Sequence, residues 1–239
     1  MVDVVIPLGT GSKTGDLELR YALRLLEKNV SNVGDVYVIG KRPKGFTNLI
    51  VHEIPEFAGG QYRHHNICNK VLFACELPEL TDNFLFMNDD HFINQWFDAA
   101  DFPNFYDDYL YKKGVKLNIV SPYRKTITNT FEHLKSFGLN SLNFDVHCPI
   151  LFNKNNFKNL FAELKQPEYG YCIKSIYGNY FRVDPRKIDD EKVNEPLSAA
   201  ALSDLLKGRP WFSCGDKGFT KAFIKALESA VPNKSKYEL

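Results

Sequence analysis

Cysteine is scarce in this sequence, and its arrangement excludes two common ways of stabilising a fold. The five cysteines are odd in number, widely spread and never spaced as a Cys-x-x-Cys pair. Such a pattern argues against a disulfide framework and against a structural zinc site. The simplest interpretation is a set of reduced thiols, as in a cytosolic protein.

Long apolar runs and an excess of one charge are missing as well. No stretch approaches the roughly 18 apolar residues of a membrane-spanning helix, and residues 2–7 resemble a strand rather than the start of a signal peptide. The formal net charge is +1, so no overall field draws the chain to nucleic acid or to an anionic membrane. We therefore expect a cytoplasmic protein without a signal peptide or a membrane span.

The sequence does have enough length for one substantial core. Its 239 residues show no internal repeat, and we expect one domain that spans residues 1–239. Aromatic residues make up 14% of the chain, with 19 Phe and 12 Tyr. Most of these rings should pack in the core, which leaves some to stack on a base or a sugar.

Strand and helix signals alternate in the first half of the chain. This pattern is typical of an α/β protein with a mixed, mainly parallel, Rossmann-like sheet and helices on both faces. Asp16 is placed to cap the first helix, whose apolar positions run from Leu19 to Leu26. A second helix is expected over 65–76, and the predicted strands cover 2–7, 35–40, 49–54 and 84–87.

The pattern is less regular after residue 95. Short strands are expected at 117–120 and 149–153, and helices at 153–164, 198–206 and 218–230. Residues 184–196 form a charged stretch bounded by prolines, which predicts a loop that serves either as a lid or as a plain connector.

Two polar segments follow predicted strands, the Gly-rich loop 9–15 and the triplet Asn88-Asp89-Asp90. Ligands of open α/β sheets bind beyond the carboxyl ends of the strands, where both segments fall. Adjacent carboxylates after a buried strand repel each other, and a magnesium or manganese ion that also binds diphosphate oxygens would neutralise them. The alternatives are a plain surface turn for the loop and a capping turn for the triplet.

Three more groups are candidates for chemistry. Asp145 and His147 lie two residues apart on an extended segment, and hence on one face of it. They would serve there as a base, a metal ligand or a phosphate partner. The alternative is a structural hydrogen bond between the two side chains. Arg124 and Lys174 would bring positive charge to a diphosphate, unless they are solvated surface. Asp216 follows a late apolar turn that would place its carboxylate at a site.

Several blocks of the sequence resemble a known family. Residues 16–24 with 36–39, residues 84–92, and residues 145–149 with Phe152 are similar, in order and spacing, to blocks of the Stealth proteins, which are sugar-1-phosphate transferases. The chain also resembles small glycosyltransferases of GT-A type, many of them phage-encoded, in its opening Val-Ile-Pro-Leu-Gly and its Asn-Asp-Asp-His. It departs from Stealth at residues 6–11, and little of the family's fourth block follows Pro149.

The resemblance implies roles for individual residues. Asp89 and Asp90 would hold a Mn²⁺ or Mg²⁺ ion on the donor diphosphate. His147 or Asp145 would be the acceptor-side base or a phosphate contact. Asp216, which the resemblance does not include, is a further candidate for the catalytic base. Gly9 and Thr10 would line the nucleotide, and Arg20 would support the site from its helix. Beyond the resemblance, the donor-binding candidates also include Pro7, Asn88, Arg124 and Lys174.

The predicted activity is therefore that of a metal-dependent, GT-A-like glycosyltransferase with a UDP-sugar as the favoured donor. Residues 1–95 would bind the donor, and residues 96–239 would bind the acceptor and carry the base. One alternative is the Stealth reaction itself, and another is a non-catalytic module that binds a sugar or a nucleotide. Modified DNA, a polysaccharide and a small acceptor all remain open, and a phage-encoded enzyme would act in the host cytoplasm.

Overall fold

The core of the protein is a five-stranded sheet with the strand order β4-β3-β1-β5-β9. The computed structural model describes residues 1–57, 59–111 and 121–239. Four of the strands run parallel and β9 is antiparallel at one edge, so the predicted mixed, mainly parallel sheet is confirmed. The strands are β1 (Val2–Leu8), β3 (Val33–Gly40), β4 (Ile50–His52), β5 (Asn83–Phe86) and β9 (Ile150–Asn153).

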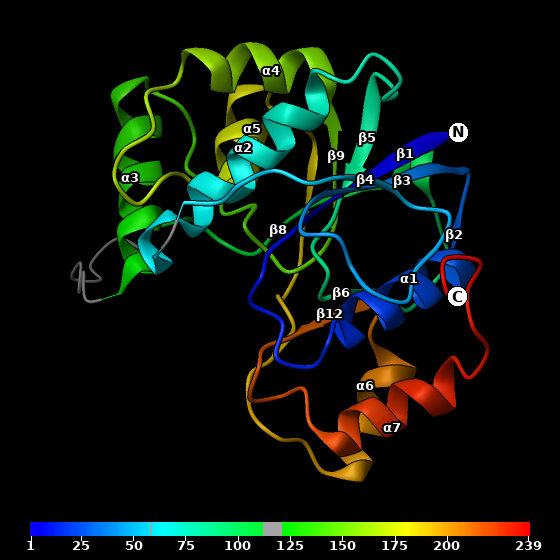
Figure 1. Ribbon diagram of the computed structural model, residues 1–239. Helices are drawn as coiled ribbons and strands as arrows, with labels where there is room; N and C mark the ends of the chain where they lie inside the picture. Colours follow the sequence, from blue (N-terminus) through cyan, green and yellow to red (C-terminus); the bar gives the residue numbers. More distant parts are fainter. Residues whose placement is uncertain (58, 112–120) are drawn as a thin grey trace.

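Helices cover both faces of this sheet, as the sequence predicted (Figure 1). Every residue of β1 is buried, and its neighbouring side chains enter opposite cores because successive residues of a strand point to opposite faces. Val4 and Ile6 pack with residues of one set of helices, whereas Val5 belongs to the core of the other set. The first set is α1 (Leu17–Asn29), α6 (Ala199–Gly208) and α7 (Lys221–Ala230), and the second is α2 (Arg63–Cys75), α4 (Lys154–Glu163) and α5 (Ile173–Tyr180).

A second, smaller sheet brings the late part of the chain to the end of β5. Its order is β11-β12-β6, made of β11 (Lys192–Val193), β12 (Trp211–Cys214) and β6 (His91–Ile93). Strand β12 runs antiparallel to β6 and pairs Ser213 with His91. The remaining elements are β2 (Val30–Ser31), η1 (Gly60–Tyr62), β7 (Phe97–Asp98), η2 (Ala99–Asp101), β8 (Asn104–Tyr106), α3 (Pro122–Ser136) and β10 (Pro185–Lys187).

Some expectations from the sequence need correction. Asp16 occupies the N-cap position of α1 but makes no side-chain cap hydrogen bond, because its backbone is left-handed (φ 64°) and its carboxylate instead accepts from Lys41 at 3.1 Å. The charged stretch 184–196 is not a plain loop, since it contains β10 and β11, which pair with β8 and β12. Helices α3 and α5 were not predicted. The strand expected at 117–120 lies outside the described residues.

The five cysteines are all free and buried. Among the helices that the structure describes, none combines the length and the apolar character needed to cross a membrane.

Candidate active site

The carboxylate pair lies between the two sheets. Asn88, Asp89 and Asp90 follow one residue after β5 and are half-buried. Asp90 Oδ2 accepts a hydrogen bond from Ser213 Oγ at 2.9 Å and lies 3.5 Å from Lys192 Nζ. The second sheet therefore fixes the position of Asp90, through residues that are far from it in the sequence.

Asp89 lies in an environment that disfavours its negative charge. Burial, together with the negative charges of Asp90 and Glu18, raises its pKa to about 7. Within the described ranges, no group of three or more His, Cys, Asp or Glu side chains is arranged to hold a metal ion. Two oxygen-ligand side chains nevertheless fit magnesium or manganese, which are held by one or two carboxylates and complete their shell with substrate phosphates and water.

The Gly-rich loop 9–15 lies beside this pair. The carboxylate of Glu18, in the first turn of α1, accepts hydrogen bonds from Thr14 Oγ1 and from Ser12 Oγ, the latter at 3.2 Å. Lys13 forms an exposed ion pair with Asp216 at 2.7 Å, which joins the loop to the turn after β12. Of the predicted nucleotide-lining residues, Pro7 is buried in β1, whereas Gly9 is half-buried and Thr10 is exposed.

His147 is held by a carboxylate that the sequence did not suggest. Its Nδ1 lies 2.5 Å from Asp190 Oδ2, and its backbone N–H donates to Asp190 Oδ1 at 2.7 Å. A histidine that donates from Nδ1 to a carboxylate has its Nε2 lone pair free to accept a proton. The hydrogen bond between Asp145 and His147 that the sequence left open is replaced by this pair.

Asp145 is ionised although it is surrounded by protein. Burial opposes its charge, but Lys174 first and then His64 and His147 outweigh this effect and hold its pKa below the usual range. Lys174 is buried and donates to the backbone carbonyls of Val146 and Cys148, the latter at 3.2 Å. Its ammonium thus fixes the backbone of the segment that carries Asp145 and His147. A contact between Lys174 and the donor stays a prediction.

His91 connects the two motifs. It is 1% exposed, and its Nδ1 accepts from the backbone N–H of Asn88 at 3.3 Å. Burial and the nearby charges of Lys174 and His147 lower its pKa well below the usual range. Asp190, which contacts His147, and Lys192, which contacts Asp90, are only two residues apart, so the Asn-Asp-Asp triplet and the Asp145–His147 segment lie at one site. The Nε2 of His91 has no hydrogen-bond partner among the described residues.

The two arginines predicted for donor binding have other surroundings than the carboxylate pair. Arg20 pairs with Glu238 at 3.3 Å and lies over the ring of Phe46, so its contacts are to the end of the chain and to the loop after β3. Arg124 is exposed in the first turn of α3. Arg63, which the sequence did not suggest, acts electrostatically on both Asp89 and Asp216. The roles of Arg20 and Arg124 stay predictions.

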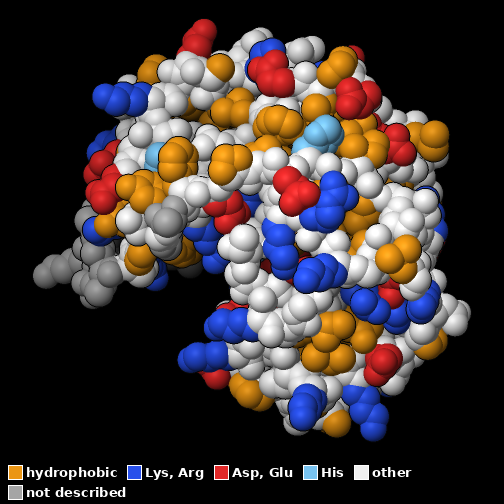
Figure 2. Space-filling view, in the orientation of Figure 1, with side chains coloured by type: hydrophobic (Ala, Val, Ile, Leu, Met, Phe, Trp, Pro, Cys, Tyr) orange, Lys and Arg blue, Asp and Glu red, His pale blue; other side chains and the backbone are white. Residues whose placement is uncertain are grey.

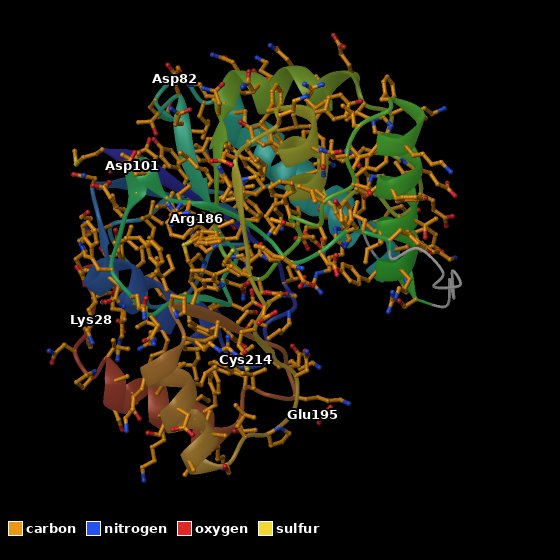
Figure 3. The ribbon with its side chains drawn as sticks, turned by 180° about the vertical axis from the view of Figure 1, so that it is seen from behind. Lys28, Asp82, Asp101, Arg186, Glu195 and Cys214 are labelled. Atoms are coloured by element: carbon orange, nitrogen blue, oxygen red, sulfur yellow. The ribbon has the colours of Figure 1, made fainter. Side chains whose placement is uncertain are left out.

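The surface around the site is hollowed. Figure 2 shows a hollow between the part that carries α2 and α3 and the part that carries α6 and α7, with Lys and Arg side chains along it. Cys214, at the end of β12, lies inward, whereas Glu195 extends outward from the neighbouring loop (Figure 3). Burial raises the pKa of the Cys214 thiol to about 12, so it is a poor nucleophile.

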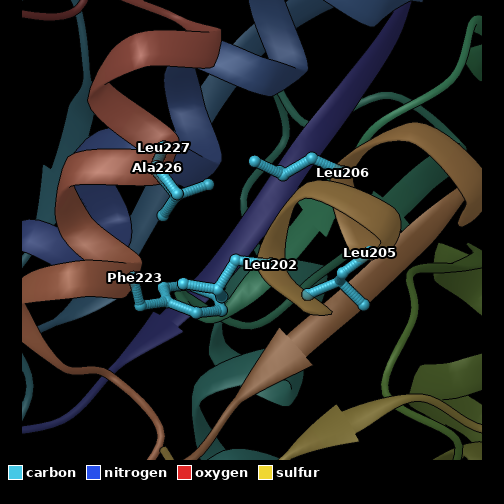
Figure 4. Close-up of a pocket in the computed structure, with 6 residues that line it drawn as sticks. All are labelled: Leu202, Leu205, Leu206, Phe223, Ala226 and Leu227. Carbon is cyan, nitrogen blue, oxygen red and sulfur yellow. The ribbon is translucent and has the colours of Figure 1, made fainter. Parts of the chain in front are cut away.

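A gap between α6 and α7 has a different character (Figure 4). It is lined by six apolar residues: Leu202, Leu205, Leu206, Phe223, Ala226 and Leu227. No lining side chain offers a hydrogen bond, and the gap has no room for a water molecule. It is a packing defect between two helices rather than a ligand site.

The residues that the sequence failed to indicate share one property. Each lies in an unremarkable local context and reaches the site only because the chain folds back on itself. Asp190 is 43 residues from His147, and Ser213 is 123 residues from Asp90. Within the described part of the chain, such residues include Glu18, Arg63, Asp190, Lys192 and Ser213.

No protein-family model matches this sequence, and no curated protein is similar to it. Solved structures with an overall likeness of fold include the following three. Mouse xyloside xylosyltransferase 1 aligns with a TM-score of 0.42 and 11% identity, covering 91% of this chain and 96% of its own. A glycosyltransferase involved in the glycosylation of the major capsid of PBCV-1 aligns with 0.45 and 14%, covering 96% and 100%.

The third is 4-diphosphocytidyl-2C-methyl-D-erythritol synthase from Anaerococcus prevotii, with a TM-score of 0.38, 10% identity and coverage of 97% and 96%. At these identities the likeness concerns the fold alone. The function proposed below rests on the site, and the resemblance to Stealth proteins and the phage origin stay predictions.

Proposed function

We propose that this protein is a metal-dependent glycosyltransferase that moves a sugar from a nucleotide-sugar to an acceptor hydroxyl. The observation that carries the proposal is the meeting, in one site, of the Asp89–Asp90 pair with the Asp190-bound imidazole of His147. The first suits the leaving diphosphate and the second suits the attacking hydroxyl. A non-catalytic module has no need of a histidine prepared as a base.

The donor side is built to hold negative charge. Asp89 and Asp90 would hold the metal ion, which supplies a positive centre for the leaving diphosphate when it is bound. Lys192, beside Asp90, and Arg63, near Asp89, add positive charge around the same place. The backbone of Gly9 and Thr10, beyond the end of β1, would line the nucleotide.

The acceptor side is built to remove a proton. His147 Nε2 takes the proton of the acceptor hydroxyl while Asp190 stabilises the imidazolium that forms. The hydroxyl oxygen bonds to the anomeric carbon of the sugar, and the bond from that carbon to the diphosphate breaks. Asp216 is a poorer candidate for the base, because its hydrogen bond with exposed Lys13 lowers its pKa.

The first experiment is isothermal calorimetry of UDP with and without manganese. We expect the wild-type protein to bind UDP only with the metal, and a variant with Asp89→Asn and Asp90→Asn to lose this binding. A matched control carries Asp82→Asn and Asp101→Asn, which remove the same charge from exposed positions on the side shown in Figure 3. Metal-independent binding, or equal loss in the control, contradicts the assignment.

The nucleotide released during turnover separates the remaining alternatives. Glycosyl transfer releases a nucleoside diphosphate, whereas the Stealth reaction releases a nucleoside monophosphate because the acceptor attacks phosphorus. A binding module releases neither. Phosphorus NMR of a reaction with UDP-glucose or UDP-N-acetylglucosamine distinguishes these outcomes.

A further inference from the structure

Two stacked rings stand at the site without a role in the chemistry described so far. Tyr123, in the first turn of α3, and His64, in the first turn of α2, have ring centroids 6.0 Å apart and planes inclined by 22°. The Tyr123 side chain is 42% exposed, whereas most aromatic side chains of this protein lie in its two cores. Two helices thus meet to present a flat aromatic surface to solvent.

Further rings lie along the start of α2 and just before it. His65 contacts Tyr62 edge to face at 5.8 Å, and Tyr62 contacts Phe57 at 5.8 Å. Phe57 is 57% exposed, and its backbone is tied to α2 by two hydrogen bonds with the Asn66 side chain. The exposed rings therefore belong to an ordered strip rather than to one stray side chain.

The inner end of the strip meets a carboxylate. The Tyr123 hydroxyl is hydrogen-bonded to Asp145, and this bond and His64 both help to lower the pKa of Asp145. Two residues further along the same segment is His147, which pairs with Asp190. An ionised carboxylate accepts hydrogen bonds from hydroxyl groups and repels phosphates. A flat apolar face beside such a carboxylate matches a sugar ring, which has C–H groups on its faces and hydroxyls around its edge.

From this geometry we infer that the acceptor is a carbohydrate, with a sugar ring packed on Tyr123 and His64 and its hydroxyls bonded to Asp145. The inference rests on the proposed function and names its acceptor class. A sugar in this position presents a further hydroxyl to His147. Nucleic acid is the less suitable acceptor, because the net charge of the chain is only +1 and Asp145 lies where a phosphodiester would approach.

Direct binding tests the inference independently of turnover. Saturation-transfer NMR is recorded with the methyl glycosides of glucose, galactose, mannose and N-acetylglucosamine, and with a single-stranded oligodeoxynucleotide. We expect at least one glycoside to bind the wild-type protein, Tyr123→Ala to weaken it about tenfold, and Tyr123→Phe to weaken it less, since the ring remains. The matched control is Phe137→Ala, because Phe137 is 63% exposed at the other end of α3.

The possible outcomes separate cleanly. The inference is wrong if no glycoside binds, if Tyr123→Ala and Phe137→Ala behave alike, or if the oligonucleotide binds through Tyr123. It is also wrong if Tyr123→Ala abolishes metal-dependent UDP binding while its melting curve is unchanged, because the rings then belong to the donor site. If the wild-type protein binds glycosides through Tyr123 but never binds UDP, the sugar site stands and the transferase proposal fails.

Discussion

At the scale of single residues, three acidic side chains of the site have different protonation behaviour for different reasons. Burial and like charges raise the pKa of Asp89 to about 7. Asp145 is also surrounded by protein, yet Lys174 and two histidines hold its pKa low. Asp216 is exposed and has a lowered pKa because it is hydrogen-bonded to Lys13. Of the three, only Asp89 lacks a strong positive partner, which is why we assign it to the metal.

The His147–Asp190 pair gives a prediction at this scale. Asp190→Asn should lower kcat at least about 100-fold, because an amide neither fixes the tautomer of His147 nor stabilises its charged form. The KM for the donor should change little. Asp189→Asn is the matched control, since Asp189 is the exposed neighbour in the same stretch. A pH–rate profile that is identical for the two variants would remove the pair from the mechanism.

At the scale of elements, the site depends on how closely α5 approaches the segment before β9. Gly178, within α5, lies against the ring of Phe144, and a Cβ atom there would be 2.7 to 2.8 Å from three ring carbons. Phe144 is 1% exposed, and its backbone N–H donates to Ser175 Oγ at 3.0 Å. The absence of a side chain at residue 178 therefore positions the residues that follow Phe144, including Asp145 and His147.

Gly178→Ala should accordingly destabilise the protein by about 1 to 3 kcal/mol, because the ring of Phe144 is enclosed and cannot move freely. Gly208→Ala provides the control: no atom lies within 4 Å of the added Cβ at the end of α6, and alanine favours the helix. Urea unfolding of both variants measures the difference. Equal urea midpoints for the two variants would show that the ring of Phe144 moves aside without a loss of stability.

At the scale of the whole molecule, the last residues of the chain close the structure over α1. Glu238 has a buried carboxylate that accepts from Arg24 at 2.7 and 2.8 Å and pairs with Arg20 at 3.3 Å. Burial opposes the charge of Glu238, but the hydrogen bonds of Arg24 and of the Ser235 N–H outweigh it and lower its pKa. These ion pairs join α1 to a residue more than 200 positions later in the sequence.

Glu238→Gln should lower the free energy of unfolding at pH 7 by about 3 kcal/mol, because two arginines lose a buried partner. Since the folded pKa lies below the ordinary value of 4.5, the stabilisation is complete above pH 4.5 and is lost as the pH falls further through the folded pKa. The difference between wild type and variant should therefore shrink in urea unfolding at pH 3. Glu53→Gln, in an exposed pair with Arg42, should cost less than about 1 kcal/mol.

The sequence by itself indicated the five strands of the main sheet, the mainly parallel α/β class and the carboxylate pair. Strands β1, β3 and β5 are apolar along most of their length because helices cover both of their faces, so a local pattern was sufficient to find them. The Asp89–Asp90 pair was visible for a similar reason, since its meaning depends only on the strand before it. Asp145 and His147 were found together because they are neighbours.

Only the tertiary structure decided which groups complete the site. The partner of His147 is Asp190 and those of Asp90 are Lys192 and Ser213, and these pairs lie 43, 102 and 123 residues apart. The short strands β11 and β12 bring Lys192 and Ser213 to Asp90. These strands are defined by pairing between distant segments, which leaves no local signal in the sequence. A residue's type and neighbours reveal what chemistry it offers, whereas the folded chain sets which other groups it meets.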